Sequence, residues 1–213
     1  MLQILRGIQK YSKEIFPQQK GLFKQLATGQ QPHTMMITCS DSRIDPNLIT
    51  QTQPGDVFIL RNAGNMVPAY GVSQGGEEAS IEFAVEVLGV ENIVVCGHTQ
   101  CGAMAALSGK VDLKALPSIE KWLLHAKATQ RKMEGKSPVV LDDYIEDNVL
   151  TQVQNLKTHP SIANGIAQKT LKIFGLVYRF EKGDAIIFDK QKQHFIEVRD
   201  FSNEDLISSF DLS

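Results

Sequence analysis

The sequence predicts an α/β protein with a mostly parallel β-sheet of four to five strands, flanked by helices and preceded by an N-terminal helical arm. Three short apolar runs, at residues 34–38, 57–60 and 93–96, indicate buried strands. A helical pattern over 75–90 separates the second run from the third. This strand–helix–strand order is typical of a parallel sheet, because parallel neighbours need a crossover connection.

The first thirty residues carry apolar side chains at helical spacing, with Leu2, Leu5 and Ile8 on one face. Gly29 and Pro32 then end the helical pattern before the first strand. This arm, residues 1–30, precedes the sheet and has no sheet face of its own to cover. We therefore expect it either to pack back on its own chain or to embrace a neighbouring subunit.

The second half of the chain continues the α/β pattern. Residues 117–133 and 138–157 predict helices rich in surface charge. Two further runs, 171–180 and 185–188, flank a short polar turn and predict a hairpin at the edge of the sheet. Residues 202–213 are polar with scattered apolar side chains, and we expect them to form a C-terminal tail.

Length and composition favour one globular domain that spans residues 1–213. Apolar residues make up 42% and charged residues 22% of the chain, both ordinary for such a domain. A net charge of −2 without a basic stripe argues against nucleic acid or a membrane as a partner. The apolar run at the N-terminus is too short and is interrupted too soon to be a signal peptide, so we expect a cytoplasmic protein. In that reducing compartment, three cysteines favour metal binding or catalysis over disulfides.

Two segments contain side chains suited to metal binding or catalysis: residues 39–43, Cys-Ser-Asp-Ser-Arg, and residues 97–102, Gly-His-Thr-Gln-Cys-Gly. Both follow the carboxyl end of a predicted strand, the edge where α/β sheets bind ligands. They contain two thiols and one imidazole, Cys39, Cys101 and His98, which are ligands that zinc prefers. Three protein ligands leave a position open, as in catalytic zinc sites.

Other residues of the two segments complete this hypothesis. Asp41 is a potential hydrogen-bond acceptor beside the metal. Arg43 is placed to form a bidentate ion pair with the Asp41 carboxylate and so keep it ionised. Cys96 would become a fourth ligand only if its strand turned the side chain inward. The alternative interpretation takes Cys39 and Cys101 as small buried residues, and a redox pair is disfavoured because they lack Cys-x-x-Cys spacing.

The paired motifs resemble those of the β-class carbonic anhydrases. The resemblance runs from the N-terminal arm through the hairpin near Phe188, and residues 45–50 and 61–68 are most similar to the plant and cyanobacterial branch. It implies one Zn²⁺ per chain on Cys39, His98 and Cys101, with Asp41 and Arg43 as a catalytic dyad. In the family, zinc-bound hydroxide attacks CO₂ to form bicarbonate and a proton.

The resemblance also implies a substrate site and an assembly. The positions that match substrate-binding residues of the family are Gln30, Phe58, Ala63, Phe83 and Gly102. The family forms a homodimer or a higher even oligomer, in which Gln30 often reaches substrate across the interface. Relatives that close their zinc with the aspartate carry a Trp and a Gly where this chain has Met36 and Thr38, so the resemblance implies an open site.

Two alternatives to CO₂ hydration stay open on the sequence. The same zinc site suits hydrolysis of carbonyl sulfide or carbon disulfide, with pocket width deciding between substrates. A non-catalytic scaffold or sensor that retains zinc is the second alternative. The intact pair of Asp41 and Arg43 argues against it, since a structural zinc needs no aimed hydrogen-bond acceptor.

Overall fold

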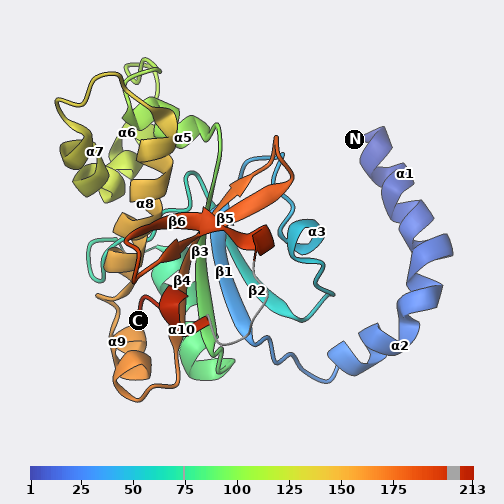
Figure 1. Ribbon diagram of the computed structural model, residues 1–213. Helices are drawn as coiled ribbons and strands as arrows, with labels where there is room; N and C mark the ends of the chain where they lie inside the picture. The colour runs from blue at the N-terminus through green and yellow to red at the C-terminus, as the bar shows by residue number, and fades with distance from the viewer. Residues whose placement is uncertain (74, 201–206) are drawn as a thin grey trace. The chain divides into compact units, whose positions relative to one another are not determined.

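The computed structural model describes residues 1–73, 75–200 and 207–213 (Figure 1). They divide into two compact units, Met1–Gln31 and Pro32–Ser213. The first unit consists of helix α1 (Leu2–Lys10), a π-helical turn (Tyr11–Ile15) and helix α2 (Phe16–Leu26). The helical arm is therefore confirmed as secondary structure. No residue of α1 or α2, which lie wholly within the described ranges, is buried.

The second unit is built on a β-sheet with the strand order β2-β1-β3-β4-β5-β6. The strands are β1 (Thr34–Cys39), β2 (Val57–Asn62), β3 (Asn92–His98), β4 (Lys172–Arg179), β5 (Asp184–Asp189) and β6 (His194–Glu197). The first four are parallel, and β5 and β6 are added antiparallel. The mostly parallel sheet and the β4–β5 hairpin are thus confirmed, but β6, and not β5 as expected, forms that edge of the sheet. The described residues form six strands, one more than expected, because the four-residue β6 is too short to leave a periodic signal.

Helices connect and flank these strands (Figure 1). They are α3 (Pro46–Thr50), α4 (Gly76–Glu82), α5 (Gly102–Leu107), α6 (Pro117–Trp122), α7 (Lys127–Met133), α8 (Leu141–Leu156), α9 (Pro160–Ala167) and α10 (Ile207–Phe210). A π-helical turn, Phe83–Val87, continues α4. No helix in the described part of the chain is long and apolar enough to cross a membrane.

The core is layered across the three central strands. Met35, Ile93 and Ile173 are fully buried and lie at matching register positions of β1, β3 and β4. The next such layer holds Ile37 and Val95, also fully buried. Burial of each of these side chains contributes about 1.5–3 kcal/mol. The ends of β1 and β3, which carry the chemical segments, therefore follow strand residues that are fully buried.

Helix α8 approaches the sheet closely because two strands present glycine to it. A Cβ added at Gly97 of β3 would lie 2.9 Å from Val149 Cγ2, and one at Gly175 of β4 would lie 3.0 Å from Val149 Cγ1. Such distances are shorter than ordinary carbon–carbon contacts. The two glycines thus admit Val149 between them, and Gly97 does so one residue before His98.

The C-terminal residues 207–213 return to the sheet. The Leu212 N–H donates to Ile173 O at 2.8 Å, and the Asp211 carboxylate accepts from the Ile173 N–H at 3.1 Å. Phe210 and Leu212 are buried. The described part of the expected tail is therefore packed, and residues 202–206 of that tail lie outside the described residues.

Candidate metal centre

The two chemical segments meet because β1 and β3 are neighbours in the sheet. Thr38 pairs with Cys96, so Cys39 and His98, which end these strands, emerge at the same edge. Cys101 follows in the loop after β3 and is the N-cap residue of α5. The three side chains are buried together, and their ligand atoms lie within 4.8 Å of one another. This group can hold a metal ion.

The hydrogen bonding of His98 indicates which ring nitrogen would face a metal. Nδ1 lies 2.8 Å from the carbonyl oxygen of Thr99, which can only accept, so Nδ1 carries the hydrogen. Nε2 is buried and has no hydrogen-bond partner among the residues that the structure describes. A buried polar atom without a partner is rare and costly. A metal ion beside the two sulfurs would satisfy the lone pair of Nε2, so the residues present fit zinc.

The thiols of Cys39 and Cys101 shift each other's pKa in opposite directions. A hydrogen bond from Cys101, helped by the nearby imidazole of His98 and the Gly64 N–H at 3.4 Å, outweighs burial and lowers the pKa of Cys39 to about 4. The hydrogen bond to Cys39 and burial raise the pKa of Cys101. The first thiolate is therefore favoured by the protein alone, and the second requires a cation that takes the place of its proton.

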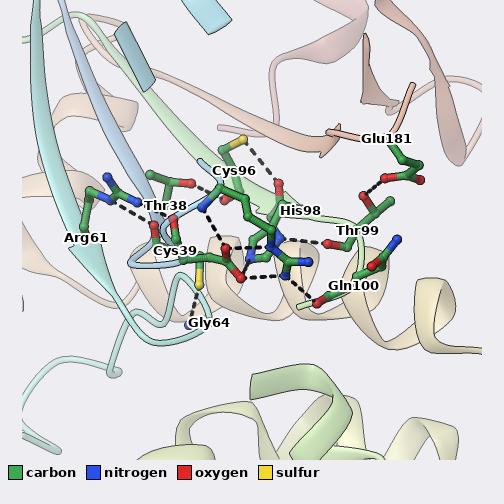
Figure 2. A network of polar contacts seen from close by, with 12 residues as sticks. Thr38, Cys39, Arg61, Gly64, Cys96, His98, Thr99, Gln100 and Glu181 are labelled. Carbon is green, nitrogen blue, oxygen red and sulfur yellow. Dashed lines mark hydrogen bonds and ion pairs between the residues drawn. The ribbon is translucent and has the colours of Figure 1, made fainter. Parts of the chain in front are cut away.

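Cys96 does not belong to this group. Its thiol donates to the carbonyl oxygen of Gly97 at 3.4 Å, and burial raises its pKa to about 12. Figure 2 shows Cys96 on the strand, apart from the labelled Cys39. The possibility of a fourth cysteine ligand is thus removed for the described residues, and the group contains Cys39, His98 and Cys101 alone.

Asp41 and Arg43 form a two-pronged ion pair beside the group. Arg43 Nε donates to Asp41 Oδ1 at 2.9 Å, and a terminal guanidinium nitrogen donates to Oδ2 at 2.7 Å. These bonds hold the pKa of the Asp41 carboxyl well below its usual range. Asp41 Oδ2 lies 3.9 Å from His98 Nε2, so the carboxylate borders the ligand group without joining it.

Several contacts fix the guanidinium and the loops around the group. Arg43 also donates to Gln100 O at 3.1 Å and lies over the ring of Phe180, 4.5 Å from its centroid. Arg61 donates to the carbonyl oxygens of Cys39 and Asp41 at 2.9 and 2.8 Å. The backbone after β1 is therefore held by Arg61, which Figure 2 shows beside Cys39.

Sequence reasoning missed Gly64, Thr99 and Glu181, which contact the ligands or the loop that bears them. The Thr99 hydroxyl donates to Glu181 Oε2 at 2.5 Å, across 82 residues of chain. The left-handed backbone of Gln100, with φ of 55°, was also not foreseen. Only the glycine of Arg-Asn-Ala-Gly-Asn offered a signal, since a glycine after a strand often marks a close approach of backbone to a site.

The structure locates the predicted substrate-binding residues as follows. Phe58 on β2 and Phe83, the first residue of the second π-helical turn, lie with their ring centroids 6.2 Å apart and their planes tilted by 41°. Ala63 accepts from the Trp122 indole at 2.7 Å and precedes Gly64. Gly102 is the exposed first residue of α5, directly after Cys101. Gln30 belongs to the helical unit, so its relation to this group stays a prediction.

Comparison with known proteins agrees with this geometry. The family described as "Carbonic anhydrase" matches residues 34–185. A carbonic anhydrase of Synechococcus elongatus is 44% identical over 192 residues, which cover 87% of this chain and 71% of that protein.

Two solved structures extend the comparison to the fold. The β-carbonic anhydrase CcaA superimposes with a TM-score of 0.90 and 39% identity, covering 92% of this chain and 98% of that one. A tetrameric β-carbonic anhydrase of Sordaria macrospora gives a TM-score of 0.76 and 29% identity, with 86% and 94% covered. The chain is therefore a member of the β-carbonic anhydrase family.

Proposed function

We propose that this protein interconverts CO₂ and bicarbonate at one zinc ion held by Cys39, His98 and Cys101. The observation that carries the proposal is the buried Nε2 of His98, which has no hydrogen-bond partner in the described part of the chain and belongs to a Cys-His-Cys group whose ligand atoms lie within 4.8 Å of one another. Zinc, when bound there, supplies a Lewis acid that makes water a nucleophile at neutral pH. The membership of the chain in the β-carbonic anhydrase family supports the same reaction.

Asp41 would orient the water that attacks CO₂ by accepting its hydrogen bond. Both carboxylate oxygens are engaged by Arg43, and this pairing keeps Asp41 ionised. The fork also restrains the carboxylate, which otherwise stands near enough to His98 to compete as a ligand. Arg43 is therefore the residue that keeps Asp41 a hydrogen-bond acceptor and the site open.

The remaining predicted residues would bind substrate. Phe58, Ala63 and Phe83 supply apolar surface that suits CO₂, and the contact between the two rings supports a shared wall. The Gly102 N–H would donate to bicarbonate. Gln30 would hydrogen-bond substrate from the helical unit of a second subunit in the assembly.

The proposed assembly is a homodimer or a higher even oligomer in the cytoplasm, without nucleic acid or membrane as partners. The arm supports it, because the helical unit buries no residue of its two helices, both fully described. The tetrameric relative of Sordaria macrospora is in keeping with an even assembly.

The experiment is a stopped-flow assay of the zinc-loaded protein with CO₂, alongside hydrolysis assays with carbonyl sulfide and carbon disulfide. We expect rapid CO₂ hydration and little turnover of the two sulfur compounds. Turnover of carbonyl sulfide or carbon disulfide without CO₂ hydration would replace the proposed reaction by a hydrolase. A full zinc content without any turnover would point to a scaffold or sensor.

A further inference from the structure

We propose that the turn between β4 and β5 positions the metal-binding loop, with Thr99 and Glu181 acting as positioning residues for His98. This inference rests on the proposed zinc site and assigns a role to two residues outside the ligands and the dyad. Figure 2 shows the chain of contacts from His98 through Thr99 to Glu181.

Thr99 is held at three points. Its N–H donates to Tyr178 O at 3.0 Å, which extends the pairing of β3 with β4 by one residue beyond His98. Its hydroxyl donates to Glu181, and its carbonyl oxygen accepts from His98 Nδ1 at 2.8 Å. The direction of that carbonyl selects the ring tautomer and aims Nε2 at the sulfurs. Whatever fixes Thr99 therefore fixes the imidazole ligand.

Glu181 is suited to hold the hydroxyl. The hydrogen bond from Thr99 lowers the pKa of Glu181, so the carboxylate is ionised at neutral pH and the bond is charge-assisted. Thr99 itself is buried, while Glu181 is an exposed residue of the turn. The turn thus reaches a buried loop with one charged side chain.

The same loop bears more of the site than His98. Gln100 follows in a left-handed conformation, which a non-glycine residue adopts only under local constraint, and Cys101 comes next. Gln100 O accepts from Arg43, and Arg43 lies against Phe180, the residue before Glu181. Two consecutive residues of the turn therefore contact the metal loop and the guanidinium of the dyad.

The test compares hydroxyl and carboxylate variants by their affinity for zinc and by the visible spectrum of the cobalt-substituted protein. Thr99→Val and Glu181→Ala are expected to weaken zinc binding about tenfold, as loss of an outer-shell partner does, and to shift the cobalt spectrum. Thr99→Ser keeps the hydroxyl and should retain the wild-type zinc affinity and cobalt spectrum. Glu181→Gln keeps an acceptor without charge and should fall between wild type and Glu181→Ala.

Controls separate positioning from general destabilisation. Glu134→Gln removes the same charge at an exposed position outside the site and should leave affinity and spectrum unchanged. The double variant Thr99→Val with Glu181→Ala should bind zinc no more weakly than either single variant, because both remove one interaction. If Thr99→Val fails to fold, Glu181→Ala and Glu181→Gln still decide the matter.

The outcomes distinguish this inference from the proposed function. Wild-type zinc affinity and an unchanged cobalt spectrum in Glu181→Ala would overturn the positioning role while leaving the zinc site intact. A wild-type protein that binds no zinc would instead overturn the proposed function.

Discussion

Hydrogen bonding at single residues separates the ligands of the proposed site from their neighbours. Cys96 and Cys101 are equally buried, at 1% exposure, and both lie within three residues of His98. The Cys96 thiol is satisfied by a backbone carbonyl, whereas the Cys101 thiol faces Cys39. One is therefore a neutral core side chain and the other a member of the group that converges on His98 Nε2.

Asp41 provides the prediction at this scale. Asp41→Ala removes the acceptor proposed to orient the attacking water but none of the three ligands, so zinc content should stay at the wild-type level. CO₂ hydration should fall about 100-fold, the usual range for loss of such a group. Stopped-flow rates and metal analysis on the same samples give both quantities.

The control for this variant is Asp112→Ala, an exposed carboxylate that accepts from the nearby Lys114 N–H. It should keep wild-type activity. Full activity of Asp41→Ala at full zinc content would remove Asp41 from the proposed reaction.

At the scale of elements, helix α8 holds the loop that touches Cys39. Asn148 Nδ2 donates to Gly64 O at 3.1 Å, and Gln152 Oε1 accepts from the Val67 N–H at 2.8 Å. Gly64 in turn donates to Cys39 Sγ. A row of buried amides on one helix thus connects the core to a proposed metal ligand.

Gln152→Leu tests this connection. Leucine is similar in size but leaves the Val67 N–H and the Asn148 Oδ1 without their partner, and each such buried group costs about 1–3 kcal/mol. We expect the free energy of unfolding to fall by about 3 kcal/mol in urea denaturation of the protein. Gln154→Leu, at an exposed position of the same helix, should change it by less than about 0.5 kcal/mol. Equal stability of the two variants would contradict the structural role of the amide row.

The elements that carry the ligands were predictable because local sequence specifies them. The run that ends at Cys39 is apolar and buried along its length, and the loops behind β1 and β3 are polar. Helices α5 and α9 were not predicted, because their six and eight residues span too few turns for a helical pattern of apolar residues to be recognised. The contact of Thr99 with Glu181 was beyond reach for another reason: it depends on the pairing of β3 with β4, which no local pattern encodes.

At the scale of the whole molecule, the chain combines a sheet-based unit with a helical unit of 31 residues. The sheet-based unit has its own layered core. Two helices alone cannot enclose a core, and apolar side chains such as Leu5 and Ile8 stay exposed within the helical unit. The proposed oligomer would supply the surface that these side chains need.

Leu5→Glu is predicted to disrupt this assembly. A carboxylate at the apolar face of α1 cannot be buried without a large desolvation cost, so association should weaken tenfold or more. Sedimentation velocity over a range of protein concentrations measures the shift toward smaller species. Gln3→Glu adds the same side chain on the opposite face of α1 and should leave the assembly intact. A monomeric wild-type protein would exclude the oligomer.

The measurement that bears most directly on the central claim is a zinc titration of the metal-free protein, followed by CO₂ hydration. We expect activity to rise in proportion to added zinc and to level off at one zinc per chain. Cys101→Ala should lose this response, whereas Cys96→Ala, which removes the cysteine outside the ligand group, should keep it. Activity that is independent of zinc, or that needs Cys96 and not Cys101, would contradict the assignment of the site.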